Sequence, residues 1–131
     1  FLIKKNTFIF ESVVKRTIRG RYTIIGADPD KIWEFNKKKI YVIENQKKKI
    51  IKGSPYLFLK KLIQDFKFPL PKQLPPISSL LVGYFSYDII RYIEKIPDKC
   101  IDDLKIPDVR ILRPKTLIIH DNLKKKNIFY N

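Results

Sequence analysis

The segment from Leu80 to Glu94 constrains the fold of this chain most, because its pattern leaves few side chains for solvent. Leu80 to Phe85 is a short apolar run interrupted by Gly83, which is typical of a buried strand at a point where another backbone comes close. Asp88 then provides a cap for a short helix that runs toward Glu94. The segment predicts a strand, a tyrosine-rich corner and a capped helix, in that order.

The side chains around this corner have a structural interpretation. Helical spacing places Ile89, Ile90 and Ile93 on an inner face and Arg91 and Glu94 on an outer face. The rings of Tyr84 and Tyr87 are expected to be buried, with their hydroxyl groups hydrogen-bonded. We therefore interpret Gly83, Tyr84, Tyr87, Asp88 and Arg91 as a structural motif, and no residue of the chain as catalytic.

Runs rich in β-branched and aromatic residues predict a sheet in the rest of the chain. The expected strands are 8–10, 22–26, 31–35, 40–43, 49–51, 109–112, 116–120 and 126–130. Gly26 and Pro29 are expected to end the second strand, and polar turns at 36–38 and 44–46 join the next three strands into a meander. A turn at Asp121 and Asn122 joins the last two.

One amphipathic helix and a proline-rich connector complete the prediction. Ser54 caps the helix and Pro55 suits its first turn. The expected buried face has helical spacing and consists of Leu59, Leu62, Ile63 and Phe66. Four prolines exclude a helix or a central strand from 68–79, and 97–107 is expected to be a polar loop. The fold class is therefore α+β, a mostly antiparallel sheet with a few helices.

The composition indicates one cytoplasmic domain. A chain of 131 residues, 44% hydrophobic and 13% aromatic, is long enough for a single packed domain, 1–131. The single cysteine, Cys100, excludes an internal disulfide, and the single histidine, His120, leaves no histidine-based metal site. No apolar run approaches the roughly 18 residues of a membrane span.

The net charge of +15 suggests a polyanion partner at first sight. The excess comes, however, from lysine runs at predicted turns and strand ends, at 37–39, 47–49, 60–61 and 124–126. Arginine, which binds phosphate and guanine in a bidentate manner, occurs only six times. We interpret the charge as solvated turns together with a composition typical of AT-rich genes, and expect neither nucleic acid nor membrane as partner. A small basic nucleic-acid-binding module is the alternative.

Two pairs of residues are candidates for a binding site. Glu11 and Ser12 follow the first strand, where a carboxylate and a hydroxyl group can meet the ammonium and amide groups of a small amino acid, although serine often simply ends a strand. Arg21 and Tyr22 are expected near the same pocket. Arg21 can pair with Glu11 or with a ligand carboxylate, or it can hold the shape of its loop.

Three blocks of the sequence also form an ordered pattern. They are Phe8-Ile-Phe-Glu-Ser12 with Gly20-Arg-Tyr-Thr-Ile-Ile-Gly-Ala-Asp-Pro29, then Gly83-Tyr-Phe-Ser-Tyr-Asp88 with Arg91-Tyr-Ile-Glu94, and finally Asp103-Leu-Lys-Ile-Pro-Asp108 with Leu112-Arg-Pro114 and Ile118-Ile-His-Asp121. In this order they resemble the N-terminal part of anthranilate synthase component I, the large, chorismate-using subunit. Ser86 stands where that family commonly has glycine.

The resemblance implies part of a layered α/β sandwich and a role in tryptophan biosynthesis. The whole enzyme converts chorismate and ammonia to anthranilate and pyruvate with Mg2+, and a glutamine amidotransferase subunit supplies the ammonia. In that family the Glu-Ser pair, here Glu11 and Ser12, lines half of the tryptophan feedback pocket, with Arg21 and Tyr22 nearby. The chorismate and magnesium site lies in a C-terminal domain, so we expect this chain to be an inactive fragment that packs on that domain. The para-aminobenzoate synthase large subunit is the alternative family.

Overall fold

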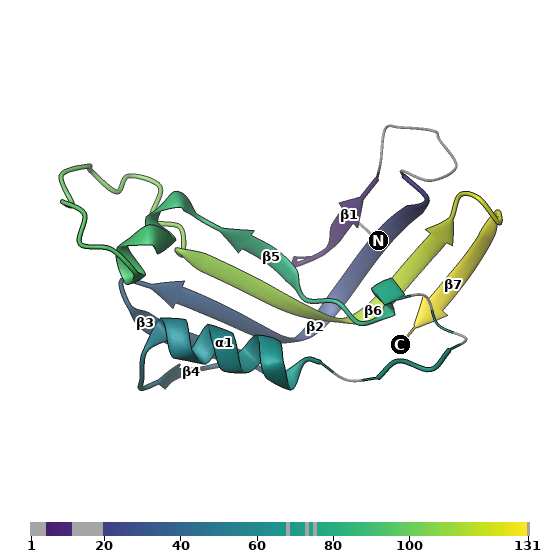
Figure 1. The fold of residues 1–131 in the computed structure, drawn as a ribbon, viewed down its shortest axis with the longest axis horizontal. Helices are drawn as coiled ribbons and strands as arrows, with labels where there is room; N and C mark the ends of the chain where they lie inside the picture. The colour runs from purple at the N-terminus through teal and green to yellow at the C-terminus, as the bar shows by residue number, and fades with distance from the viewer. Residues whose placement is uncertain (1–4, 12–19, 68, 73, 75, 131) are drawn as a thin grey trace.

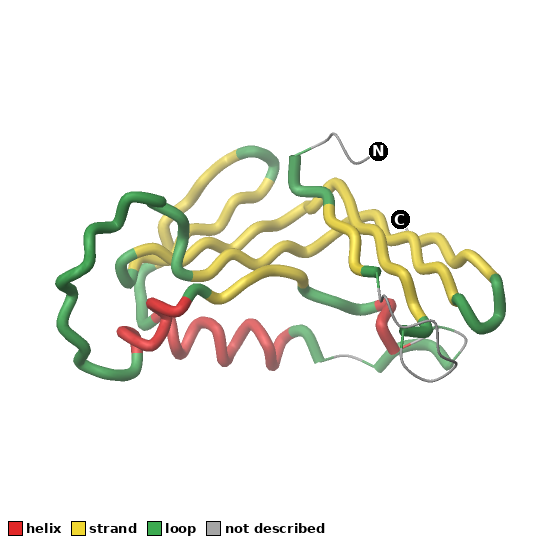
Figure 2. The backbone as a smooth tube through the Cα atoms, turned by 90° about the horizontal axis from the view of Figure 1, so that it is seen from above, coloured by secondary structure: helices red, strands yellow, loops and turns green. Residues whose placement is uncertain are grey.

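The computed structural model describes residues 5–11, 20–67, 69–72, 74 and 76–130. Within these residues, seven antiparallel strands form one sheet, and the helices lie along one side of it (Figure 1, Figure 2). The strands are β1 (Phe8–Phe10), β2 (Tyr22–Asn36), β3 (Lys39–Glu44), β4 (Lys47–Ile51), β5 (Val82–Phe85), β6 (Val109–Asp121) and β7 (Lys126–Tyr130). One α-helix, α1 (Pro55–Asp65), and two 3-10 helices, η1 (Pro76–Ser78) and η2 (Tyr87–Tyr92), accompany them. The α+β class with a mostly antiparallel sheet is confirmed.

Two long strands, β2 and β6, run through the whole sheet and pair with each other. One half of this ribbon carries β3, β4 and β5, and the other half carries β1 and β7. The prediction that each long strand would be two short ones is wrong, since both continue through a proline. Pro29 and Pro114 stand opposite each other. Both residues that lack an amide proton therefore meet at one level, so their missing donors affect the ladder at a single level.

A bulge at this level keeps one face of the sheet apolar along its full length. Pro29 pairs with Pro114 but Lys31 pairs with Arg113, so Asp30 is one extra residue in β2. Such an insertion moves every later side chain to the opposite face. The core positions of β2 are accordingly even-numbered before the bulge (Tyr22, Ile24) and odd-numbered after it (Trp33, Phe35), whereas those of β6 are odd-numbered throughout (Val109, Ile111, Leu117, Ile119).

The apolar face is filled by two clusters, one in each half of the ribbon. Under α1 the buried residues are Trp33, Phe35, Ile40, Leu62, Val109 and Ile111. In the other half Ile24, Leu117 and Ile119 are buried, and Phe8, Tyr22, Ile77, Leu80 and Ile128 pack against them. Ile77 belongs to η1 and Leu80 precedes β5, so the end of the proline-rich connector packs on the second cluster.

The helix and the meander agree with most of the predicted details. Polar two-residue turns join β2, β3 and β4, as expected. α1 begins at Pro55 after Ser54, but the Ser54 side chain makes no capping hydrogen bond. Ile63 is 50% exposed, contrary to prediction, and Phe58 packs on the core in its place. The buried face is therefore centred on Leu62 and is rotated slightly from the predicted one.

The corner after β5 differs more from its prediction. Ser86 occupies the N-cap position of η2, and Asp88 does not cap the helix but accepts a 2.7 Å hydrogen bond from Nε of Arg91. Tyr87 is 88% exposed and Tyr84 is 38% exposed, so neither ring is fully buried as expected. Because η2 is a 3-10 helix with three residues per turn, its side chains do not follow the α-helical faces assumed for it.

Other groups stabilise this corner instead. The Arg91 guanidinium, expected to face solvent, turns back and donates to the carbonyl groups of Ile96 (3.1 Å) and Pro97 (2.9 Å). The Tyr92 hydroxyl donates to the Asp108 carboxylate at 2.6 Å, and burial raises the pKa of Tyr92 well above its usual range. The apolar residue Ile93 is 70% exposed rather than inward-facing.

Deletion of Asp30 tests the bulge. Without this residue β2 cannot keep both Ile24 and Trp33 on the apolar face, so we expect cooperative unfolding in urea to be lost. The matched control is Asp30→Ala, which removes only an exposed ion pair with Arg113 and should cost roughly 0–1 kcal/mol. Equal stability of the deletion variant and Asp30→Ala would show that the bulge does not set the facing of β2.

Gly83→Ala tests the close approach of β5 to β6. A Cβ atom on Gly83 would lie 1.9 Å from the Arg110 carbonyl oxygen. This agrees with the sequence-based prediction that another backbone comes close to Gly83. The strand must shift to admit the methyl group, so we expect a loss of roughly 1–3 kcal/mol in the free energy of unfolding. Tyr87→Ala, in the same corner, is the control and should change it by less than about 0.5 kcal/mol.

Candidate functional site

Three strand ends meet at one end of the sheet and bring the candidate residues into one region. β1 ends at Phe10, which pairs with Ile24, so the following residue Glu11 leaves the sheet beside the start of β2. Tyr22 begins β2 and pairs with Asp121, the last residue of β6. Figure 1 shows the three ends close to one another at the β1 side of the ribbon. Ser12, the remaining candidate, lies outside the described residues.

Arg21 forms a bidentate pair with Asp121. Its Nη2 atom donates to Oδ2 of Asp121 at 2.7 Å, and its Nε atom lies 3.1 Å from both carboxylate oxygens. The Asp121 side chain is only 5% exposed, whereas that of Arg21 is 33% exposed. The hydrogen bonds from Arg21 hold the pKa of Asp121 well below its usual range, and those to Asp121 raise the pKa of Arg21.

Asp121 also organises the turn between β6 and β7. Its Oδ1 atom accepts the backbone amides of Leu123 (3.0 Å) and Lys124 (3.1 Å). The next residue, Asn122, donates its backbone amide to the carbonyl of Arg21 at 2.8 Å. One carboxylate therefore fastens the start of β2 to the end of β6. This is the loop-holding role that the sequence left open for Arg21, with Asp121 rather than Glu11 as the partner.

Tyr22 and Glu11, the other two described candidates, differ in their exposure to solvent. The Tyr22 ring is half-buried against the second apolar cluster, and the Arg21 guanidinium lies 4.9 Å from the centre of the ring. The Glu11 side chain is exposed, and no described residue forms an ion pair with it. The arrangement offers an exposed carboxylate and an aromatic ring with a cation above it, which are groups that suit the ammonium and aromatic parts of an amino acid.

A second charged cluster, on the opposite half of the sheet, was not predicted. Glu34 is 7% exposed, although its side chain is ionisable. It accepts hydrogen bonds from Arg110 and, at 2.9 Å, from Nζ of Lys48. Arg110 also donates to Asn6 at 2.7 Å. The sequence predicts a strand at 31–35, but no local signal shows that Arg110 stands opposite Glu34.

No group of three or more His, Cys, Asp or Glu side chains within the described ranges could hold a metal ion. None of the helices in those ranges has the length and apolar character that a membrane crossing needs. Cys100 is exposed, and His120 makes a 2.6 Å hydrogen bond with Asn127.

Comparisons with known proteins give one consistent result. No family model matches the chain. The chain is 34% identical over 126 residues to anthranilate synthase component 1 of Cereibacter sphaeroides, covering 92% of the chain and 25% of that protein. It is 35% identical over 127 residues to the protein of the same name in Acinetobacter calcoaceticus, covering 89% and 25%. The crystal structure of anthranilate synthase component I from Streptococcus pneumoniae has the same fold, with a TM-score of 0.69 at 23% identity over 92% of this chain and 26% of that one. The chain thus spans about a quarter of the length of these relatives.

Asp121→Asn tests the ion pair through its pH dependence. The pKa of Asp121 is lowered in the folded chain, so its stabilisation is fully present above the ordinary value of 3.8 and is lost as the pH falls through the lower folded value. We expect wild type to melt at a higher temperature than Asp121→Asn at about pH 7, and the difference to shrink from about pH 4 downward. Asp103→Asn, at an exposed position, is the control. A difference that stays constant with pH would contradict the role of the Asp121 charge.

Proposed function

The chain is homologous to anthranilate synthase component 1 over about nine-tenths of its length, and we propose that it is the N-terminal regulatory and structural domain of such an enzyme. The domain would have two tasks. It would contribute half of a tryptophan feedback site through Glu11, Ser12, Arg21 and Tyr22, and it would pack on a catalytic domain.

The meeting of three strand ends is the observation that carries the first task. Glu11 and Tyr22 come from different strands and reach the same end of the sheet. Glu11 would bind the ammonium group of tryptophan, and Tyr22 would lie along its indole ring. Arg21 is occupied by Asp121, so we propose that it positions Tyr22 and the strand ends, and that it reaches the ligand only indirectly.

The outer face of the sheet, opposite α1, supports the second task. In the half that carries β1 and β7, four apolar side chains form one cross-strand row on this face: Ile9, Ile25, Ile118 and Phe129. Ile9 is 45% exposed and Phe129 is 69% exposed. A contiguous apolar row at a sheet surface is typical of a protein interface. The proposed occupant is the catalytic domain, which would complete the layered sandwich.

Feedback then follows from the position of the site at the edge of this interface. Tryptophan bound between the two domains would stabilise one relative arrangement of them, and the other arrangement would be the active one. In the proposed enzyme the catalytic domain would take up chorismate and Mg2+, and an amidotransferase subunit would deliver ammonia from glutamine. The product would be anthranilate, with pyruvate released. The domain alone would be inactive.

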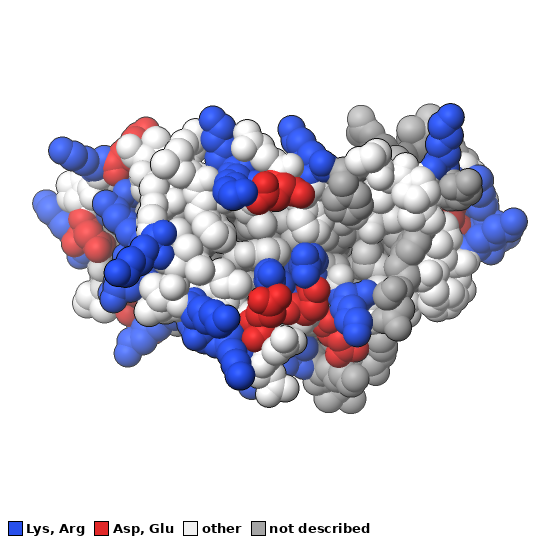
Figure 3. All heavy atoms as spheres, turned by 90° about the horizontal axis from the view of Figure 1, so that it is seen from below, with Lys and Arg blue, Asp and Glu red and all other residues white. Residues whose placement is uncertain are grey.

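The charge distribution does not favour the basic nucleic-acid-binding alternative. The lysines are distributed over turns, connectors, the edge strand β4, α1 and the other strands. Figure 3 shows that, on the side of the molecule seen from below, Lys and Arg are interspersed with Asp and Glu. Such a distribution lacks the continuous basic stripe that tracks a phosphate backbone.

Ser12→Phe, made in a complete enzyme that carries this domain, tests the feedback role. We expect normal conversion of chorismate but no inhibition by tryptophan, because the larger side chain fills the proposed pocket. Glu11→Gln should weaken inhibition by about 10- to 100-fold, the value of one charged hydrogen bond. Both are measured as the tryptophan concentration that halves the rate of anthranilate formation.

Glu94→Gln is the matched control for Glu11→Gln, since it removes another exposed carboxylate far along the chain. It should leave both activity and inhibition unchanged. Normal inhibition in Ser12→Phe and Glu11→Gln together would defeat the assignment of the tryptophan site, although the relationship to component 1 would stand.

A further inference from the structure

A second pocket lies between α1 and the sheet, in the other half of the ribbon from the proposed tryptophan site. Its volume is about 650 Å3, and residues of β2, β3, β6 and α1 line it. Arg113, one of its residues, and Asp121 are eight positions apart on β6. At about 3.3 Å per residue this separation is roughly 26 Å, so the two sites are distinct.

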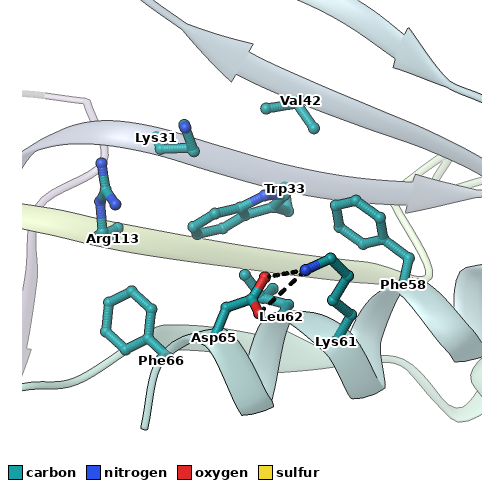
Figure 4. A pocket seen from close by; sticks show the side chains of 9 residues that line it. All are labelled: Lys31, Trp33, Val42, Phe58, Lys61, Leu62, Asp65, Phe66 and Arg113. Atoms are coloured by element: carbon teal, nitrogen blue, oxygen red, sulfur yellow. Dashed lines mark hydrogen bonds and ion pairs between the residues drawn. The ribbon is translucent and has the colours of Figure 1, made fainter. Parts of the chain in front are cut away.

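The interior of this pocket is aromatic. Figure 4 shows the Trp33 ring between the sheet and α1, with Phe58 at one end of the pocket and Phe66 at the other. Trp33 is 5% exposed, because Leu62 of α1 packs beneath it in the core. The ring is therefore held in place by packing and has little open surface of its own. Phe58 and Phe66 are only half-buried and provide open aromatic surface in the pocket, which favours an aromatic or planar apolar ligand.

The rim of the pocket is cationic. Lys31, Lys61 and Arg113 contribute positive charge, and Asp65 is the single acidic residue of the lining. Each cation has a carboxylate partner: Lys31 pairs with Glu44 at 3.0 Å, Lys61 with Asp65 at 2.8 Å and Arg113 with Asp30 at 2.5 Å. Glu44 and Asp30, however, lie outside the lining, so a ligand in the pocket would contact three cations and one carboxylate.

These ion pairs can be exchanged for a ligand at little cost. The three carboxylate partners are between 41% and 59% exposed. Exposed pairs of this kind are screened by water and contribute little to stability. An anionic ligand group can therefore take over one of the cations, while the displaced carboxylate returns to solvent.

We propose that this pocket binds a small aromatic carboxylate, with its ring between Phe58 and Phe66 beside Trp33 and its carboxylate at the cations of the rim. Asp65, the one carboxylate of the lining, is paired with Lys61 and is therefore not free to bind an ammonium group of the ligand. The proposed ligand accordingly has a carboxylate but no ammonium group. This requirement separates the pocket from a site for an amino acid. The proposal rests on the pocket alone and is independent of the feedback role.

Trp33 is the only tryptophan of the chain, so its fluorescence reports directly on the pocket. We would titrate the 131-residue chain with 3-phenylpropionate as the probe and follow the Trp33 emission. A saturable change is expected, with a dissociation constant of about 0.1–1 mM for a ligand of this size. The uncharged analogue 3-phenylpropionamide should bind at least about 10-fold more weakly, since it lacks the charge for the rim.

Two triple variants complete the test. Lys31→Gln, Lys61→Gln and Arg113→Gln together should weaken 3-phenylpropionate binding by about 10-fold or more. The charge-matched control is Lys49→Gln, Lys60→Gln and Lys126→Gln, at exposed positions outside the pocket, and it should bind like wild type. A linear, non-saturable change, or equal binding of acid and amide to wild type, would overturn the proposal whether or not the variants fold. Equal weakening in both triple variants would overturn it as well, because it would indicate general charge attraction.

Discussion

The pairing of β2 with β6 is the interaction on which the rest of this structure depends. These two strands are the only ones among the described residues that take part in both halves of the sheet. Four of the other strands pair directly with one of them over part of its length, and β4 is attached through β3. Both apolar clusters are built on the inward positions of β2 and β6. The bulge at Asp30 makes this possible, because it brings Trp33 to the same face as Ile24. A single extra residue thus unites two short amphipathic ribbons in one layer.

The functional proposals follow from the two ends of this ribbon. At one end the Arg21–Asp121 pair closes the ladder and leaves Glu11 and Tyr22 at a common edge. In the other half α1 covers the apolar face incompletely and leaves the pocket beside Trp33. On the outer face of the sheet, the half with β1 and β7 carries the apolar row of Ile9, Ile25, Ile118 and Phe129. The half with β3, β4 and β5 carries the Glu34–Arg110 pair. The same scaffold therefore presents one edge suited to a ligand shared with a second domain and one pocket of its own.

Much of the positive charge lies in turns and on an edge strand. Lys47, Lys48 and Lys49 lie on β4, an edge strand, where lysine discourages pairing with another sheet. Lys37 and Lys38 form the turn between β2 and β3, and both have left-handed φ angles. Charge at these places costs little, because the side chains extend into water. Lys48 is an exception, because it pairs with the buried Glu34: Arg110 of β6 and Lys48 of β4 both reach this carboxylate.

The sequence by itself determined the elements whose signals are local. The strand with Gly83, the helix after Ser54 and the meander of β2, β3 and β4 follow from apolar spacing, proline and turn residues, which act over a few neighbouring positions. The resemblance in three blocks also indicated the family. Only the tertiary structure decided the continuity of β2 and β6, since a proline inside a strand is tolerated here because Pro114 stands opposite Pro29. Likewise, Arg21 has its partner 100 positions away, and no local pattern selects Asp121 over Glu11. Register between distant strands depends on which faces are buried together, and that is a property of the folded chain alone.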